Sequence, residues 1–316
     1  MMPTADFSKD ILGYNIVDCE IRSREIFYFI AREDCTQWTD WKDEGRYPDD
    51  TALTLRVITN FMSNPQESQW GHATLNGFDI STIEISKTPK EQLILTSISG
   101  QTYAIGSGEA GMEENILKQT RGGVFKLKNI TGTLYAAGGM RTVGFRKNRN
   151  EWAWYNDSIP FQDERRRIGF RDLDGFSQDD IYAVGGYGDV WHFNGGSWRP
   201  VDFPSNLFLE TVCCGADGRV YISGYEGHTF VGRGDTWKKV ESKELISLAF
   251  KDMVWYEDRV WCTNDYGVWW IVGDQLVKAN IPAFAQISAG HLSARDGVLL
   301  LAGFYGAAYL ENGQWH

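Results

Sequence analysis

The sequence predicts an all-β protein, a single β-propeller of four-stranded antiparallel blades, because one strand-rich segment recurs four times at nearly constant spacing. Each copy holds a turn, a short apolar strand and a turn of the form Gly-x-x-Gly, or a close variant of it. The anchor residues at the end of that strand are 39, 40 and 39 residues apart, and they are Gly185, Gly224, Asn264 and Gly303. A repeat of roughly 40–50 residues made of strands is typical of propellers.

The composition agrees with many short strands joined by tight turns. Of the 316 residues, 42% are hydrophobic and 14% are aromatic, and 34 are glycine against 8 proline. Aromatic residues favour strands, and glycine favours the turns between them.

The order of signals within a repeat assigns its strands. The strand before the anchor is the second of its blade, and the first strand lies upstream, as in 209–215 and 286–294. The third strand carries an aromatic residue, which is Trp191, Phe230, Trp270 or Tyr309. The fourth begins near Trp198, Trp237, Val277 or Trp315.

Two earlier segments, 100–106 and 132–138, keep the turn-to-anchor spacing of the second strand. Residues 152–155 then form an outer strand of the second of these units. Further upstream, 25–31 with Trp38 and Trp41 forms a first blade and 53–86 forms another. We expect seven blades, with six and eight as alternatives.

Three segments interrupt the repeat and are predicted to be loop insertions. They are 33–50, with seven acidic and two basic side chains, 107–121, which lacks strand character and suggests a loop with a short helix, and 158–173, with a basic run at 165–167. Loops that depart from a repeat often carry function. A charged run is also common on ordinary solvated surfaces.

The formal net charge is −11, which argues against nucleic-acid binding and would steer a basic partner toward the protein. The same charge could simply keep a soluble protein dispersed. The five cysteines form no Cys-x-x-Cys and the five histidines no metal-binding spacing, so buried free thiols, no metal and no cofactor are expected. No secretory signal and no apolar run of ~18 residues are visible, so we expect a cytoplasmic protein without a membrane span.

Residues 180–198 resemble a widespread group of bacterial propeller repeats, similar to the sialidase-type and kelch-type superfamilies. The shared features are the sequence Asp-Ile-Tyr-Ala-Val-Gly, a second glycine and an outer tryptophan. The resemblance implies a propeller, and most such proteins bind partners. The WD-repeat signature is absent as a repeated feature.

The resemblance also suggests a catalytic alternative. A sialidase-like propeller needs clustered arginines and a tyrosine nucleophile, and Arg141, Arg165, Arg167, Arg171 and Tyr187 are the residues available. No motif places them together, so no catalytic residue is predicted. His192 is expected to be a packed, hydrogen-bonded side chain.

The residues between the two glycines of the repeated turn are the candidate partner-binding face. They are Tyr187, Tyr225, Glu226, Asp265, Tyr266, Phe304 and Tyr305. Aromatic rings offer large contact area at low entropic cost, and the acidic members suit a cationic group. The alternative is that each ring packs on the neighbouring blade.

The sequence therefore predicts a non-catalytic, protein-binding propeller, and most specifically an immunity-type inhibitor that binds and neutralises a basic bacterial toxin domain. One alternative is a carbohydrate-active hydrolase or lyase that works in the central channel. Another is a structural subunit of a larger assembly.

Overall fold

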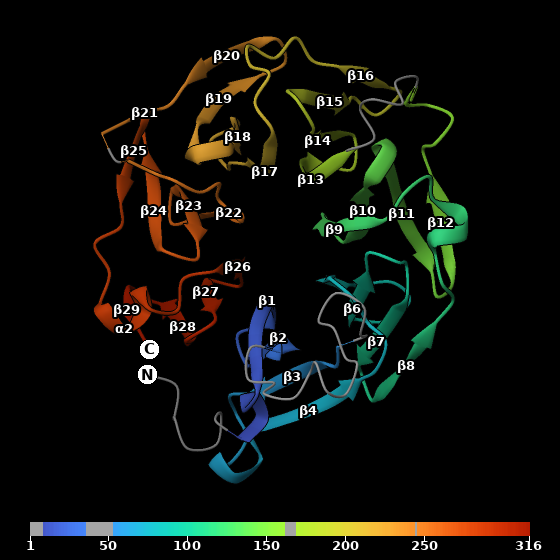
Figure 1. Cartoon of the computed structure of the whole chain (residues 1–316), viewed down its shortest axis with the longest axis vertical. Coiled ribbons are helices and arrows are strands. Elements are labelled where there is room, and N and C mark those ends of the chain that lie inside the picture. The colour runs from blue at the N-terminus through green and yellow to red at the C-terminus, as the bar shows by residue number, and fades with distance from the viewer. Residues whose placement is uncertain (1–8, 36–52, 162–168, 244) are drawn as a thin grey trace, which may run out of the picture. The chain divides into compact units, whose positions relative to one another are not determined.

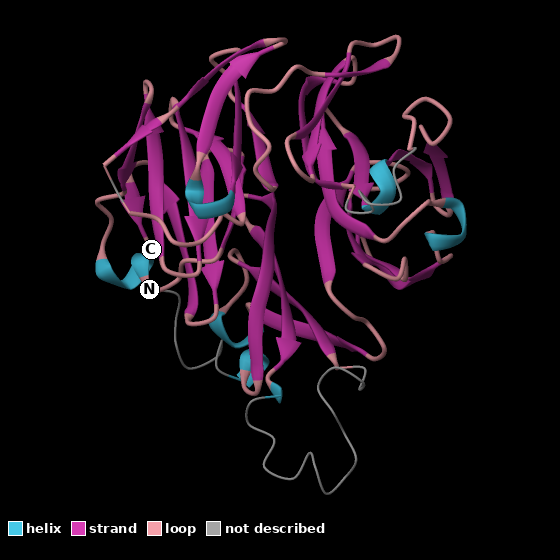
Figure 2. Ribbon diagram, turned by 45° about the horizontal axis from the view of Figure 1, so that its top comes forward, coloured by secondary structure: helices cyan, strands magenta, loops and turns pink. Residues whose placement is uncertain are grey.

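Strands make up nearly all of the regular structure, as Figure 2 shows. The computed structural model describes residues 9–35, 53–161, 169–243 and 245–316. The chain divides into two compact units. The smaller unit contains residues 1–80, 265–267 and 280–316, and the larger unit contains residues 81–264 and 268–279.

The smaller unit holds two four-stranded antiparallel sheets. Blade 1 consists of β1 (Tyr14–Ser23), β2 (Ile26–Glu33), β3 (Leu55–Phe61) and β4 (Trp70–Leu75), with the short 3-10 helix η2 (Gln66–Ser68). Blade 7 consists of β26 (His291–Arg295), β27 (Val298–Gly303), β28 (Gly306–Glu311) and β29 (Gln314–Trp315), preceded by helix α2 (Ala283–Gln286). Strand β1 packs against β26 and β27, so the first and last blades share one apolar core.

The larger unit holds five sheets, which Figure 1 labels in chain order. Blade 2 consists of β5 (Ser81–Ser86), β6 (Gln92–Ser97), β7 (Thr102–Gly106) and β8 (Glu109–Glu113), followed by η3 (Leu117–Gln119). Blade 3 consists of β9 (Val124–Ile130), β10 (Thr133–Gly138), β11 (Thr142–Asn148) and β12 (Glu151–Trp154), with η4 (Gly139–Arg141).

Blade 4 consists of β13 (Phe170–Ser177), β14 (Asp180–Gly185), β15 (Asp189–Phe193) and β16 (Trp198–Pro200). Blade 5 consists of β17 (Leu209–Cys214), β18 (Val220–Gly224), β19 (Thr229–Arg233) and β20 (Thr236–Lys239), with η6 (Tyr225–Gly227). Blade 6 consists of β22 (Asp252–Tyr256), β23 (Arg259–Asn264), β24 (Gly267–Val272) and β25 (Gln275–Lys278). The two-residue strand β21 (Glu241–Ser242) adds to its outer edge and runs parallel to β25.

The apolar core lies between neighbouring blades. Within the larger unit, the first strands of adjacent blades pack on one another, and the fourth strands lie on the outside (Figure 1). Separate buried clusters fill the spaces between blades 2 and 3, 3 and 4, 4 and 5, and 5 and 6. Blades 3, 4 and 5 therefore bury both faces of their sheets.

The anchor glycines are required by close backbone contacts. A Cβ at Gly185 would lie 2.2 Å from the Gly169 carbonyl oxygen, and one at Gly303 would lie 1.9 Å from that of Ala289. At these glycines the end of the second strand thus passes too close to the start of the first strand for any side chain. This contact explains why the repeat shows its glycine so clearly.

Six sheets of four antiparallel strands, and a seventh to which β21 adds a fifth, confirm the predicted fold, an all-β, seven-bladed β-propeller. The second strands β14, β18, β23 and β27 lie where the template predicts them. The first strand predicted at 209–215 is β17, and the outer strand predicted at 152–155 corresponds to β12.

Four assignments outside the clear repeats are wrong. Residues 53–86 are not one blade, because β3 and β4 complete blade 1 and β5 opens blade 2. Segment 100–106 contains β7, the third strand of blade 2, rather than a second strand. The stretch 107–121 has the expected short helix η3 but also the strand β8. In 286–294 the strand starts only at His291, because helix α2 and its final turn occupy the preceding residues.

Candidate functional site

Three aromatic side chains form a continuous row at one end of blades 4 and 5. The ring centres of Tyr187 and Phe208 are 6.0 Å apart with perpendicular planes, and those of Phe208 and Tyr225 are 5.8 Å apart. Tyr187 and Tyr225 are each 57% exposed, whereas Phe208 between them is half-buried. We call Tyr187, Phe208 and Tyr225 the aromatic row.

The backbone fixes this row by joining the turn of blade 4 to the start of blade 5. The Gly188 amide donates to the Leu207 carbonyl at 2.8 Å, and the Tyr225 amide donates to the Phe208 carbonyl at 3.0 Å. A Cβ at Gly188 would lie 1.9 Å from the Ser205 carbonyl oxygen. The second glycine of the turn is therefore needed to bring Phe208 between the two tyrosines.

A small acidic and basic cluster adjoins Tyr225. Glu226 lies at the tip of the turn with a φ of 55°, and its carboxylate is 3.9 Å from His228 Nε2. A cavity of about 170 Å³ lies beside it and is lined in part by Lys239 and Ile246. The predicted residues Tyr187, Tyr225 and Glu226 therefore belong to one surface of the larger unit.

The other four predicted residues lie in the smaller unit. Phe304 and Tyr305 form the turn between β27 and β28, and Asp265 and Tyr266 precede β24. Tyr266 and Tyr305 are 75% and 81% exposed. Most of each of these two side chains is open to solvent.

Phe208 is the residue that sequence reasoning missed. It lies outside the repeated turn, directly before β17. In the sequence, Phe208 is an aromatic residue directly before a predicted first strand. Because the feature is not repeated, the sequence pattern does not single it out.

Arg141 and Arg171, two of the arginines available for a sialidase-like cluster, form ion pairs with carboxylates. Arg141 Nε and Nη2 contact the two Asp189 oxygens at 2.7 and 2.8 Å, and its Nη1 donates to the Pro160 carbonyl. Arg171 Nε lies 3.1 Å from a Glu210 oxygen. Arg165 and Arg167 lie outside the described residues, as does most of the loop predicted at 33–50.

Ionisable side chains also line the first strands of the larger unit, where they satisfy one another. Lys126 Nζ lies 2.5 Å from an Asp252 oxygen, and Asp172 accepts hydrogen bonds from the Thr211 hydroxyl at 2.8 Å and the Val212 amide at 3.0 Å. Burial alone would lower the pKa of Lys128, but Asp174, Asp172 and Glu84 outweigh it, and that pKa lies above its ordinary value. The Asp172 hydrogen bonds join adjacent blades 4 and 5, whereas the Lys126–Asp252 pair joins blades 3 and 6.

His192 has the packing role expected of it. Its Nε2 lies 2.8 Å from an Asp180 oxygen, and its ring stacks on that of Tyr182 with centres 4.3 Å apart. Among the helices in the described parts of the chain, none has the length and apolar character needed to cross a membrane.

Comparisons with solved structures agree with the fold. YCF48 bound to a D1 peptide superposes with a TM-score of 0.62 at 13% identity, covering 94% of this chain and 93% of that one. The WD40 β-propeller domain of Doa1 superposes with a TM-score of 0.61 at 10% identity, covering 93% and 91%. The propeller is thus WD40-like in architecture although the WD signature is absent, and the sialidase or kelch character of the repeat stays a prediction.

Sequence comparison identifies the family. No family model matches the chain. Among curated proteins, the immune protein Tsi7 of Pseudomonas aeruginosa is 30% identical over 227 residues, which are 70% of this chain and 74% of that protein. The chain therefore belongs to the family of the immune protein Tsi7.

Proposed function

We propose that this protein is an immunity protein that binds a bacterial toxin through the aromatic row and so keeps the toxin inactive in the cell that makes it. Membership in the Tsi7 family supports the immunity role, and the propeller fold suits protein binding. The observation that carries the surface assignment is the aromatic row, three rings in contact of which two are more than half exposed.

Exposed aromatic rings can supply free energy of binding. Tyr187 and Tyr225 keep apolar surface in water, and a partner that covers them gains hydrophobic free energy of about 25 cal/mol per Å². Their backbone is fixed by Gly188 and Phe208, so little entropy is lost when a partner binds. Rigid aromatic anchors of this kind dominate the binding energy of many protein interfaces.

The proposal extends to charge and to the equivalent turns. Glu226 beside the row and the net charge of −11 favour a basic toxin surface and fast association. Asp265, Tyr266, Phe304 and Tyr305 occupy equivalent turns in the smaller unit and are proposed as further contacts. A toxin that acts inside bacteria would be met in the cytoplasm, where we place this protein.

The test begins with the toxin that co-purifies with the tagged protein from cells producing both. Tyr187→Ala and Tyr225→Ala are then compared with the parent protein by biolayer interferometry. Each substitution is expected to weaken binding by about tenfold to a hundredfold, as truncated hot spots do. Melting temperatures should change little, because both side chains are exposed.

Val272→Ala is the matched control. Val272 is 53% exposed and lies at the opposite end of the strands in blade 6, so its truncation should leave binding unchanged. Recovery of no toxin would overturn the immunity role. Unchanged affinity in both tyrosine variants would overturn the aromatic row as the binding surface.

A further inference from the structure

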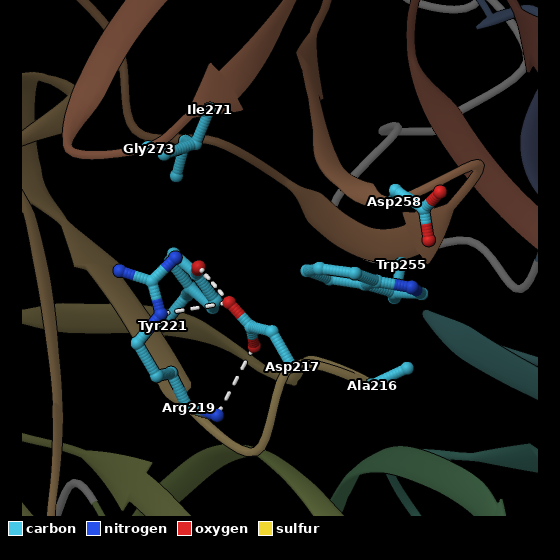
Figure 3. Close-up of a pocket in the computed structure, with 8 residues that line it drawn as sticks. All are labelled: Ala216, Asp217, Arg219, Tyr221, Trp255, Asp258, Ile271 and Gly273. Atoms are coloured by element: carbon cyan, nitrogen blue, oxygen red, sulfur yellow. Dashed lines mark hydrogen bonds and ion pairs between the residues drawn. The ribbon is translucent and has the colours of Figure 1, made fainter.

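A second pocket lies between blades 5 and 6, at the end of the strands opposite to the aromatic row (Figure 3). It has a volume of about 290 Å³. Its walls come from the β17–β18 turn, the β22–β23 hairpin and the end of β24, and they are Ala216, Asp217, Arg219, Tyr221, Trp255, Asp258, Ile271 and Gly273. We call it the Trp255 pocket. All of these residues belong to the larger unit.

The Trp255 indole supplies an aromatic wall. The ring approaches the backbone of blade 5, because a Cβ on Gly215 would lie only 2.7 Å from ring atom Cε3. Figure 3 shows the ring nearly edge-on, with Asp258 above one end and Asp217 beyond the other. An indole face attracts cations through its quadrupole more strongly than any other side-chain ring.

The two carboxylates of the pocket, Asp217 and Asp258, differ in their hydrogen bonds and ion pairs. The Asp217 carboxylate accepts hydrogen bonds from Arg219 Nε at 2.7 Å and from the Tyr221 hydroxyl at 2.8 Å. Burial opposes its ionisation, but the hydrogen bonds from Tyr221 and Arg219 hold the pKa of Asp217 below its ordinary value. Among the residues that the structure describes, Asp258 has no ion pair, and its exposed carboxylate stands at the rim.

The basic side chains near the pocket contact groups other than Asp258. Arg219 is shared between Asp217 and Asp274, whose oxygen lies 3.1 Å from Nη1. Lys238 pairs with Asp274, and the Arg259 guanidinium lies 4.9 Å from the Trp270 ring centre. The charge that is left without a counterion around the pocket is therefore the negative charge of Asp258.

We propose that the Trp255 pocket binds an alkylguanidinium or alkylammonium group, stacked on Trp255 and paired with Asp258. The volume fits one such headgroup with part of its aliphatic stem and is below that of most drug-sized ligand sites. The group comes either from a basic side chain of a protein or from a free small amine. The site is separate from the aromatic row, so it stands or falls independently of the proposed function.

The test follows the Trp255 indole N–H in proton–nitrogen correlation spectra of the full chain, with the signal assigned from Trp255→Phe. Butylguanidinium, butylammonium and butyrate are titrated at equal ionic strength. The two cations should shift the Trp255 signal saturably, and butyrate should not. An equal response to butyrate, or no saturable response to either cation, would overturn the proposal.

Asp258→Asn tests the carboxylate without changing its shape. Asp258 has a φ of 60°, a conformation that asparagine tolerates as well as aspartate does. The variant should weaken cation binding by about twofold to fivefold, as loss of an ion pair with an exposed carboxylate does. Asp296→Asn is the matched control, because Asp296 is exposed at a φ of 53° in the equivalent turn of blade 7. Equal weakening in both variants would overturn the role of Asp258.

A last comparison separates the two sources of the cation. The blocked peptide acetyl-Gly-Arg-Gly-amide is titrated beside butylguanidinium. Affinity equal to or above that of butylguanidinium supports a protein side chain as the ligand. Loss of binding with the peptide supports a free small amine and overturns the protein source.

Discussion

Ser293 in blade 7 donates a hydrogen bond of 2.9 Å to the carboxylate of Glu20 in blade 1. The same hydroxyl oxygen accepts a hydrogen bond of 3.1 Å from the Ile21 amide. Both contacts are buried, and they join blades that are 272 residues apart in the chain. No described sheet combines strands from both ends of the chain, so side-chain contacts of this kind hold blade 1 to blade 7.

Ser293→Ala should lower the free energy of unfolding by about 1–2 kcal/mol, because both buried hydrogen bonds of its hydroxyl are lost and the Ile21 amide keeps only its bond to Glu20. Urea denaturation followed by circular dichroism measures this. Ser63→Ala, at an exposed serine of the same unit, should have no measurable effect. Equal stability of the two variants would contradict the prediction.

Glu113→Gln should destabilise the larger unit by about 3–5 kcal/mol, the usual cost of breaking a buried ion pair. Glu113 at the end of blade 2 lies 2.5 Å from Arg146 Nη2 in blade 3, and the two side chains are 2% and 0% exposed. Denaturant unfolding measures the change. Glu109→Gln is the control, since it removes an exposed pair with Lys90 and should leave the unfolding midpoint where it is.

Gly188→Ala should weaken toxin binding and cost about 2 kcal/mol of stability or more. Gly188 has a φ of 70°, and a Cβ there would strike the Ser205 carbonyl, which would displace Phe208 from the aromatic row. Affinity and unfolding are measured on the same sample. Gly71→Ala, where a Cβ meets nothing within 4 Å, should change neither quantity appreciably. A variant that binds as tightly as the parent would refute the role of Gly188 in placing Phe208.

Stability should fall as the pH rises above about 8.5. Burial raises the pKa of the Cys213 and Cys262 thiols and of the Tyr135 and Tyr221 phenols. The unfolded chain releases these protons near pH 8.5 for thiols and near pH 10 for phenols, so above these values the folded state binds more protons than the unfolded state. Their stabilising contribution is complete at lower pH and is lost progressively on the alkaline side.

Cys262→Ala isolates one of these groups. Between about pH 9 and 10.5 the parent should lose up to about 1.4 kcal/mol per pH unit more than the variant, the value for one proton. Urea denaturation at several pH values gives both slopes. Parallel slopes would show that Cys262 ionises equally in the folded and unfolded states.

The architecture could be predicted from the sequence where a steric requirement allows only glycine. A Cβ at Gly185, Gly224 or Gly303 would lie 1.9–2.3 Å from a carbonyl oxygen, so only glycine fits. The repeat can therefore be recognised in the sequence. In blade 2 the same turn-to-anchor spacing, from Gly100 to Gly106, falls one strand later and ends on β7. Similar turn signals therefore precede second and third strands alike. For that reason the sequence predicts β7 as a second strand and places β3 and β4 in the wrong blade.

The site was predicted in part for a similar reason. Tyr187 and Tyr225 are found because the repeat marks their turns, and the family confirms the predicted immunity role. Phe208 and the Trp255 pocket depend on how consecutive blades meet. Phe208 is placed in the aromatic row by the backbone hydrogen bonds of segment 205–209. Trp255 and Asp217 come from two different sheets and line the same pocket. Contacts between blades have no signature within one repeat.

The pair of glycines that frames Tyr187 has a consequence for how such a protein can evolve. Backbone contacts fix Gly185 and Gly188, while the tyrosine side chain between them reaches into solvent. Under the proposed function, a substitution at Tyr187 therefore alters recognition and leaves folding almost untouched. A lineage can retune such a position as an antagonist diverges, one substitution at a time, without passing through unstable intermediates.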